Sequence, residues 1–312
     1  MTSRSGQSAR TLVTGLRGFT GAYLAEALRG AGHAVVSPKG NAASPADSRG
    51  SGFDITSLEQ CRRVIEEVRP DYIAHLAAIS FVGHANDLEF YHVNVLGTLN
   101  LLQACEDVGH TPRKILIASS ANVYGNVESD AIDESFPLAP VNHYAASKMA
   151  MEAMVRTWFE RLPIVITRPF NYTGVGQSER FLVPKIVSHF LRRDPVISLG
   201  NIDVARDFSD VRYVAQVYGA LLESDVAGET INVCTGQPYS LAQILALCGE
   251  LTGHEIRVEV NPAFVRKTDV KTLVGSSARL LAQVPEARPI PFDETVRWML
   301  GLGPSLDAAE RN

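Results

Sequence analysis

The chain has 312 residues, of which 46% are hydrophobic and 20% are charged, enough for one large α/β domain or two unequal ones with an ample core. Its 29 basic and 34 acidic residues give a net charge of −5, which excludes a chain-wide basic surface and predicts no nucleic-acid partner. The four cysteines show no Cys-x-x-Cys pairing and no metal-ligand spacing, so we expect reduced thiols and no metal site. We see no secretory leader and no run of about 20 apolar residues, and therefore expect a cytoplasmic protein without a membrane partner.

The first half of the sequence alternates short apolar runs with helical patterns, which is typical of βαβ units and a parallel sheet. Strands are expected at residues 11–14, 33–37, 71–76, 114–119 and 164–168, and helices at residues 23–29, 57–68, 93–107 and 145–161. After residue 169 the spacing becomes irregular and the loops are rich in Gly, Asn, Asp and Arg. These patterns predict an α/β fold, a Rossmann-type doubly wound parallel sheet over residues 10–170, with some later segments returning to it. A smaller C-terminal α/β lobe, over residues 171–300, is expected to bind substrate.

Three glycines recur at every third residue between the first strand and the first helix: Gly15, Gly18 and Gly21. In a dinucleotide-binding turn one glycine makes the sharp bend, another lets the backbone approach the pyrophosphate, and the third allows close helix–strand packing. The phosphates then lie at the helix N-terminus, where free N–H groups favour anions. A structural βα turn without a ligand is the alternative, and the strand–turn–helix context favours the nucleotide.

The end of the second strand indicates which dinucleotide is bound. An acidic residue there would hydrogen-bond the ribose 2′-hydroxyl of NAD, whereas a cation accommodates the 2′-phosphate of NADP. This chain has Lys39 and no carboxylate at that point, and Arg17 is a second cation inside the glycine turn. We expect NADP(H), with NAD(H) possible because both cations can equally be solvated. Asp54 and Ile55 are candidates for the adenine edge, although an ordinary aspartate before a helix is the simpler interpretation.

Tyr144 and Lys148 are four residues apart in a predicted helix, so their side chains share a face. A phenol has an ordinary pKa of about 10, and a neighbouring ammonium favours the phenolate. We therefore expect Lys148 to lower the pKa of Tyr144 toward neutrality and to make it an acid/base for a carbinol while a hydride moves. A Tyr-x-x-x-Lys pair also arises by chance on many helices, so its significance comes from the glycine turn upstream.

With these residues in view, the chain resembles the extended short-chain dehydrogenase/reductase family over about residues 11–298. The matching motifs are Thr14-Gly-x-x-Gly-Phe19-x-Gly21, His75-Leu76-Ala77-Ala78, Asn94 in Val-Asn-Val-Leu-Gly-Thr, Ser119-Ser120-Ala-Asn-Val-Tyr-Gly125, Tyr144-x-x-x-Lys148, Arg168-Pro-Phe-Asn171, Arg206-Asp-Phe-Ser-Asp210 and Arg266-x-x-Asp269.

The resemblance implies catalytic roles for three residues. Ser120 hydrogen-bonds the reacting sugar oxygen, Tyr144 is the acid/base, and Lys148 also holds the nicotinamide ribose. It further implies a nucleoside-diphosphate sugar as substrate and a homodimer. The implied cofactor contacts are Gly15, Arg17, Gly18, Phe19, Gly21, Lys39, Asp54, Ile55, Leu76, Ala77, Ala78 and Lys148.

The implied substrate contacts lie mainly in the second half of the chain. The family places Arg206 and Arg266 on the diphosphate and Asp269 toward the ribose, and Asn171 and Lys185 match positions near the sugar-phosphate. Arginine forks suit phosphate oxygens, although a single arginine in a surface salt bridge is about as common. Ser80 and Asn122 complete the expected substrate-binding set.

The residues after Ser120 bear on the reaction. A 4,6-dehydratase of this family needs an extra carboxylate there, whereas this chain has Ala121 and Asn122, and an amide cannot act as a general base. Several stretches resemble GDP-4-dehydro-6-deoxy-D-mannose reductases and their GDP-mannose 4,6-dehydratase relatives, although such reductases often have glutamate in place of Asn122. We expect NADPH-dependent reduction of the C4 ketone of GDP-4-dehydro-6-deoxy-D-mannose to GDP-D-rhamnose.

Three alternatives stay open at this point. An NDP-sugar 4-epimerase would use the same catalytic residues, and a tightly retained NAD would indicate it. A 4,6-dehydratase of the same family is the second alternative, and the missing carboxylate disfavours it. A non-catalytic dinucleotide-binding sensor is the third, and the intact Ser120, Tyr144 and Lys148 argue against it.

Overall fold

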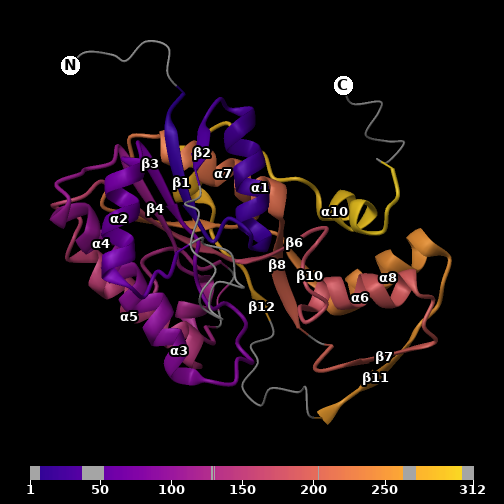
Figure 1. Cartoon of the computed structure of the whole chain (residues 1–312). Helices are drawn as coiled ribbons and strands as arrows, with labels where there is room; N and C mark the ends of the chain where they lie inside the picture. Colours follow the sequence, from indigo (N-terminus) through magenta and orange to yellow (C-terminus); the bar gives the residue numbers. More distant parts are fainter. Residues whose placement is uncertain are drawn as a thin grey trace.

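The computed structural model describes residues 8–36, 53–127, 129, 131–202, 204–262 and 272–303. Its centre is a six-stranded sheet with helices on both faces (Figure 1), and the strand order is β2-β1-β3-β4-β5-β9. Every neighbouring pair in this sheet runs parallel, which confirms the predicted Rossmann-type sheet. The strands are β1 (Arg10–Thr14), β2 (Ala34–Val36), β3 (Tyr72–His75), β4 (Lys114–Ala118), β5 (Ile164–Pro169) and β9 (Glu229–Val233).

The sheet forms because its strands are short apolar runs that are buried on both faces. All six residues of β5 are buried, which is the pattern of a central parallel strand. Neighbouring residues of β1 point to opposite faces, so Leu12 and Val13 belong to two different core layers. The layer around Val13 is covered by α1 (Phe19–Gly30) and α7 (Val211–Glu223), and the layer around Leu12 by α2 (Leu58–Val68), α4 (Gly97–Asp107) and α5 (His143–Arg156).

The predicted elements of the first half are present, with shifts of a few residues at their ends. Helix α2 has both features from which a helix can be predicted. The hydroxyl of Ser57 caps the helix by accepting from the N–H of Gln60. The helix buries Cys61, Val64 and Ile65 on one face. Prediction placed its start at residue 57, one residue before the observed helix. The predicted second strand reaches residue 37, which lies outside the described residues.

Two predicted helices differ from the structure in a way that the sequence pattern did not show. The helix expected at residues 93–107 is divided into a π-helical segment, η2 (His92–Leu96), and α4, and a short helix, α3 (Asp87–Tyr91), precedes it. The helix expected at residues 145–161 begins at His143 and ends at Arg156. Beyond it the backbone tightens into turns with i→i+3 bonds, and the hydroxyl of Thr157 donates to the carbonyl of Met154.

The C-terminal lobe contains a small mixed sheet centred on β8 (Ala205–Asp210). Strand β8 pairs with β6 (Asn171–Thr173) and β12 (Thr272–Leu273) in parallel and with β10 (Pro238–Ser240) in antiparallel. The lobe also has a parallel pair of strands, β7 and β11, and a third core layer between its helices. The remaining elements of this lobe are β7 (Val196–Leu199), β11 (Arg257–Val260), α6 (Leu182–Leu191), α8 (Leu241–Thr252) and α10 (Phe292–Met299).

The chain does not leave the central sheet for good when the C-terminal lobe begins. After β8 it returns through α7 and β9, and β9 pairs with β5 along the edge of the sheet. Helix α9 (Ala278–Gln283) then packs beside β9 through Leu280. In the described part of the chain, no helix has both the length and the apolar character needed to cross a bilayer.

Candidate active site

The glycine turn, residues 15–21, connects β1 to α1 with almost no space to spare. Gly15 has a φ of +74°, and a Cβ on it would lie 3.0 Å from the backbone nitrogen of Ala77. A Cβ on Gly21 would collide with the carbonyl oxygen of Gly15. Helix α1 begins at Phe19 and has Gly18 as its N-cap, with no side-chain cap, so its first N–H groups point outward unsatisfied.

The hydroxyl of Thr14 at the end of β1 starts a continuous chain of hydrogen bonds. It accepts from the N–H of Ala77 (3.1 Å) and donates to Nδ1 of His75 (2.7 Å). Nε2 of His75 faces the hydroxyl of Thr98 (2.9 Å), which donates to the carbonyl of Asn94 (2.7 Å). Because the hydroxyl of Thr98 already donates to Asn94, it can only accept from His75. The imidazole therefore carries its proton on Nε2.

His75 stays neutral in this chain. Burial, followed by the charge of Lys148, lowers the pKa of His75 to about 3. Its imidazole therefore fixes the segment from His75 to Ala78 at the carboxyl end of β3 without adding a charge. Leu76, Ala77 and Ala78, which the family resemblance places at the cofactor, are half-buried here, and the backbone of Leu76 and Ala77 lies directly against Gly15.

Three predicted catalytic residues come together at the carboxyl end of β4. Ser120 follows β4, and Tyr144 lies in the first turn of α5. The hydroxyl of Ser120 donates a hydrogen bond to the phenol oxygen of Tyr144. Lys148, one turn further along α5, donates from Nζ to the carbonyl of Ala118 at 2.7 Å. Tyr144 and Lys148 are 7% and 3% exposed, so both side chains are buried in the protein interior.

The prediction that the pKa of Tyr144 is lowered toward neutrality is wrong for this structure. Burial raises the pKa of Tyr144 to about 12, and the hydrogen bond from Ser120 only partly offsets that increase. Burial also lowers the pKa of Lys148 to about 8, despite the nearby charge of Glu152. The phenol is therefore protonated at neutral pH, which is the state required of a proton donor.

Glu152 and Arg168 form a buried ion pair beneath these residues that the sequence analysis missed. The guanidinium donates to both carboxylate oxygens of Glu152, from Nε at 2.9 Å and from Nη2 at 2.6 Å. The hydroxyl of Ser119 donates to the same carboxylate at 2.6 Å, and Arg168 also reaches the hydroxyl of Tyr124 at 2.8 Å. The signal was available, because Glu152 continues the spacing of Tyr144 and Lys148 by another four residues.

Asn94, in the π-helical segment η2, links the loop after β3 to helix α5. Its amide oxygen accepts from the N–H of Ile79 (2.9 Å), and its nitrogen donates to the carbonyl of Ile79 (3.2 Å) and to the hydroxyl of Ser147 (3.0 Å). Ser147 donates in turn to the carbonyl of Tyr144 (2.7 Å). Asn94 thus ties the loop after β3 to the first turn of α5, and π-helical turns of this kind are frequent at functional sites.

Other predicted cofactor residues have structural partners of their own. Oδ1 of Asp54 accepts from both the N–H and the hydroxyl of Thr56, which closes the turn before α2. Ile55 is 5% exposed and packs into the core. Arg17 is exposed within the glycine turn, and Lys39 lies outside the described residues. The assignment of these residues to a cofactor stays a prediction.

The predicted substrate residues are distributed over both parts of the molecule. Ser80 and Asn122 are exposed, one in the loop after β3 and the other on the short helix η3 (Ala121–Tyr124). In the C-terminal lobe Asn171 is exposed on β6, and Lys185 donates from Nζ to the carbonyl of Ser198 (2.6 Å).

Arg206, on β8, is half-buried and donates to the carbonyl of Ala205 (2.8 Å). Arg266 and Asp269 lie outside the described residues.

A contact that the sequence analysis did not foresee connects β6 to the glycine turn. The ring of Tyr172 lies nearly parallel to that of Phe19, with 6.2 Å between centroids, and its hydroxyl is 2.8 Å from the hydroxyl of Thr20. The strand that carries Asn171 is therefore fixed directly to the first turn of α1.

Comparisons with known proteins agree with this geometry. The sequence profile of the family described as GDP-mannose 4,6 dehydratase matches residues 12–299. The chain belongs to this family. It is 40% identical over 229 residues to GDP-6-deoxy-D-talose 4-dehydrogenase from Aggregatibacter actinomycetemcomitans, covering 73% of this chain and 78% of the relative. It is 33% identical over 282 residues to GDP-6-deoxy-D-mannose reductase from Pseudomonas aeruginosa, covering 87% and 89% respectively.

Solved structures give the same result. The Pseudomonas aeruginosa reductase RMD, complexed with NADPH, superposes with a TM-score of 0.83 at 30% identity and covers 94% of this chain and 97% of that one. A Burkholderia cenocepacia structure, named only provisionally as an epimerase, gives a TM-score of 0.86 at 47% identity with the same coverage. This member of the GDP-mannose 4,6 dehydratase family is accordingly an NAD(P)-dependent oxidoreductase of nucleotide sugars, of the GDP-deoxyhexose reductase type.

The glycine turn fits the dinucleotide that such an oxidoreductase requires. Side chains at Gly15 or Gly21 would fill the space against the backbone, and the uncapped N-terminus of α1 offers free N–H groups for a pyrophosphate. The described residues contain no group of three or more His, Cys, Asp or Glu that could hold a metal ion. All four cysteines are buried free thiols.

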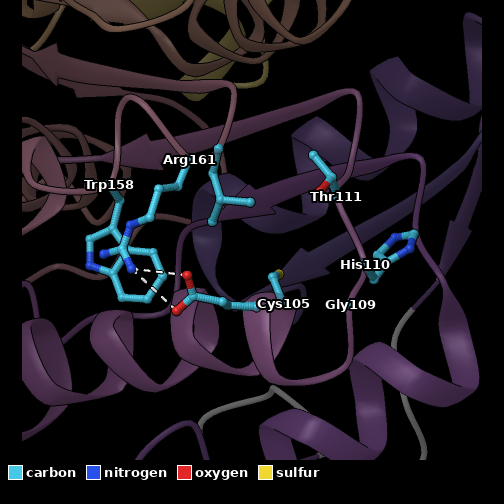
Figure 2. Close-up of a pocket in the computed structure, with 8 residues that line it drawn as sticks. Cys105, Gly109, His110, Thr111, Trp158 and Arg161 are labelled. Atoms are coloured by element: carbon cyan, nitrogen blue, oxygen red, sulfur yellow. Dashed lines mark hydrogen bonds and ion pairs between the residues drawn. The ribbon is translucent and has the colours of Figure 1, made fainter.

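A cavity of about 160 Å³ lies near the amino ends of β4 and β5, and Figure 2 shows the residues that line it. It is lined by the last turn of α4, the residues that follow this helix and residues after α5, at the amino ends of β4 and β5, whereas Ser120 follows the carboxyl end of β4. Arg161 stacks 3.7 Å over the ring of Trp158 there and donates to both carboxylate oxygens of Glu106 (Figure 2). This cavity is therefore separate from the site of Ser120 and Tyr144.

Proposed function

We propose that this enzyme uses NADPH to reduce the C4 ketone of GDP-4-dehydro-6-deoxy-D-mannose, which yields GDP-D-rhamnose. The observation that carries the proposal is the hydrogen-bonded pair of Ser120 and Tyr144, with a protonated phenol, at the carboxyl end of β4. The 33% identity to a protein named GDP-6-deoxy-D-mannose reductase supports the substrate.

The residues supply what a ketone reduction needs at the oxygen atom. When bound, the dihydronicotinamide supplies the hydride that adds to C4. The hydroxyl of Ser120 donates a hydrogen bond to the carbonyl oxygen, and Tyr144 gives its proton to that oxygen as negative charge develops. The ammonium of Lys148, held on Ala118, stabilises the phenolate that remains on Tyr144.

Dehydration is disfavoured because it also requires removal of the C5 proton and loss of the C6 hydroxyl. The two residues that follow Ser120 are the buried Ala121 and the exposed amide of Asn122, and neither can accept a proton as a general base. The reaction that matches these residues is a single hydride transfer.

The stereochemistry of the product has a second candidate. The 40%-identical relative is named for GDP-6-deoxy-D-talose, the C4 epimer of GDP-6-deoxy-D-mannose, and both arise from the same 4-ketone. Hydride addition to one face of C4 gives the first product and addition to the other face gives the second. Ser120, Tyr144 and Lys148 of this chain would have the same roles in forming either product.

The test is a mixture of enzyme, NADPH and GDP-4-dehydro-6-deoxy-D-mannose, followed by the loss of reduced-nicotinamide absorbance. We expect stoichiometric oxidation, with a product whose proton spectrum shows the large H3–H4 coupling of an equatorial C4 hydroxyl. A small coupling would identify GDP-6-deoxy-D-talose instead. No oxidation by protein that holds cofactor, together with tightly retained NAD, would replace the reductase with an epimerase.

A further inference from the structure

An aromatic contact joins the two parts of the molecule near the catalytic residues. Phe81, in the loop after β3, and Phe181, the N-cap of α6, meet edge to face with 6.1 Å between centroids and 80° between ring planes. The guanidinium carbon of Arg180 lies 5.7 Å from the centroid of Phe81. A cation at this distance from a ring face is attracted to it, so Phe81 restricts where the guanidinium of Arg180 can lie.

The loop that carries Phe81 is fixed at the reaction centre. Ile79, two residues earlier, is 6% exposed and packs in one cluster with Phe90 and Tyr144. Asn94 holds both the N–H and the carbonyl of Ile79. Phe81 is therefore only two residues from a side chain that packs in one cluster with Tyr144, and its contact with Arg180 places that residue of the C-terminal lobe at this side of the site.

The charge of Arg180 is available to a ligand. Arg180 is exposed, and none of the carboxylates in the described part of the chain forms an ion pair with it. Arg192, at the other end of α6, is a useful contrast because it pairs with Glu179 at 3.2 Å and with Asp194 at 3.1 Å. A guanidinium without a carboxylate partner, placed at the junction of two lobes, suits a phosphate group that binds between them.

We propose that Arg180 is a substrate-binding residue that contacts the diphosphate of the nucleotide sugar, and that Phe81 is the residue that positions it. The proposal rests on the proposed function for the sugar, whereas the diphosphate contact is independent of the base and of the C4 stereochemistry. Neither residue appears among the expected substrate contacts.

The experiment is calorimetric titration of the NADPH-loaded enzyme with GDP, UDP and GMP, for the wild type, Arg180→Gln and the control Arg192→Gln. We expect Arg180→Gln to weaken GDP binding by about 10-fold or more, as for the loss of one charge-assisted hydrogen bond, and GMP binding much less. Arg192→Gln should bind all three nucleotides as the wild type does. Arg180→Lys should recover part of the loss, and Phe81→Leu should show a smaller loss of the same kind.

Several outcomes would overturn the proposal: equal GDP affinity in the two glutamine variants, equal weakening of GDP and GMP, or no binding of GDP or UDP by the wild type. Steady-state assays separate it from the proposed function. Turnover of the GDP-4-ketosugar with an unchanged KM in Arg180→Gln would refute this inference alone. Selective loss of GDP binding without wild-type turnover would refute the proposed function and leave the diphosphate contact in place.

Discussion

Replacing Glu152 with glutamine removes one charge from the buried pair under the catalytic residues and changes almost nothing in shape. Glu152 is 0% exposed and its carboxylate accepts from Arg168, Arg156 and Ser119, while the side chain of Arg168 is 2% exposed. The variant therefore leaves a buried guanidinium without its counter-charge. Breaking a buried pair in this way costs about 3–5 kcal/mol of unfolding free energy.

That loss translates into a measurable fall in melting temperature. An unfolding entropy of about 2.1 cal/mol/K per residue over the chain gives a Tm lower by about 5–8 °C. Thermal unfolding followed by circular dichroism measures it. The control is Glu106→Gln, because Glu106 pairs with Arg161 at the surface, where both side chains are about 45% exposed and such pairs contribute about 0–1 kcal/mol.

The pH dependence gives a second check on the same reasoning. Burial alone would raise the pKa of Glu152, but the hydrogen bonds and charge of Arg168 outweigh it, and the pKa is lowered below its ordinary value of 4.5. The stabilisation is therefore present above pH 4.5 and is lost as pH falls through the lower, folded-state pKa. The difference in Tm between wild type and Glu152→Gln should shrink in acid. Equal Tm values for the Glu152 and Glu106 variants at neutral pH would refute the argument.

Three further predictions concern the catalytic residues and the glycine turn. Tyr144→Phe should abolish turnover and leave NADPH affinity, measured by nicotinamide fluorescence, nearly intact; near-normal turnover would contradict the proposed proton donor. The rate of ketone reduction should fall as pH rises through about 8, because Lys148 then loses the charge that stabilises the phenolate, and Lys148→Met should be slow at every pH without that decline. Gly21→Ala should lower NADPH affinity by at least about 10-fold and destabilise the fold, because its Cβ meets the carbonyl of Gly15. The matched control is Gly30→Ala at the other end of α1, where a Cβ meets nothing within 4 Å and helix propensity improves.

Local chemistry explains what the sequence could predict. The parallel strands were readable because their apolar runs are continuous, and the glycine turn because its spacing and its position between β1 and α1 identify it. Tyr144 and Lys148 were found because helical spacing places them on one face. Each of these features depends on residues that are close together in the sequence.

What the sequence could not show depends on contacts between distant segments. The partner of Glu152 is Arg168, on a different element, and the pKa of Tyr144 depends on how deeply the fold buries the phenol, which outweighs the hydrogen bond from Ser120. Asn94, in the π-helical segment η2, hydrogen-bonds the backbone of Ile79 in a separate loop. Helical periodicity singles out Glu152, but it contains no information on the partner of Glu152, on the depth at which Tyr144 is buried or on the π-helical turn.

The return of the chain through β9 makes the central sheet dependent on residues far downstream. A fragment that stops after β5 would expose the entire pairing edge of a strand whose six side chains are all buried, which is a surface prone to aggregation. Grafting the C-terminal lobe of a relative onto this chain would likewise need junctions before β6, after β8, after β9 and on either side of α9. Exchange of the C-terminal lobe therefore calls for replacement of several separate segments rather than a single crossover.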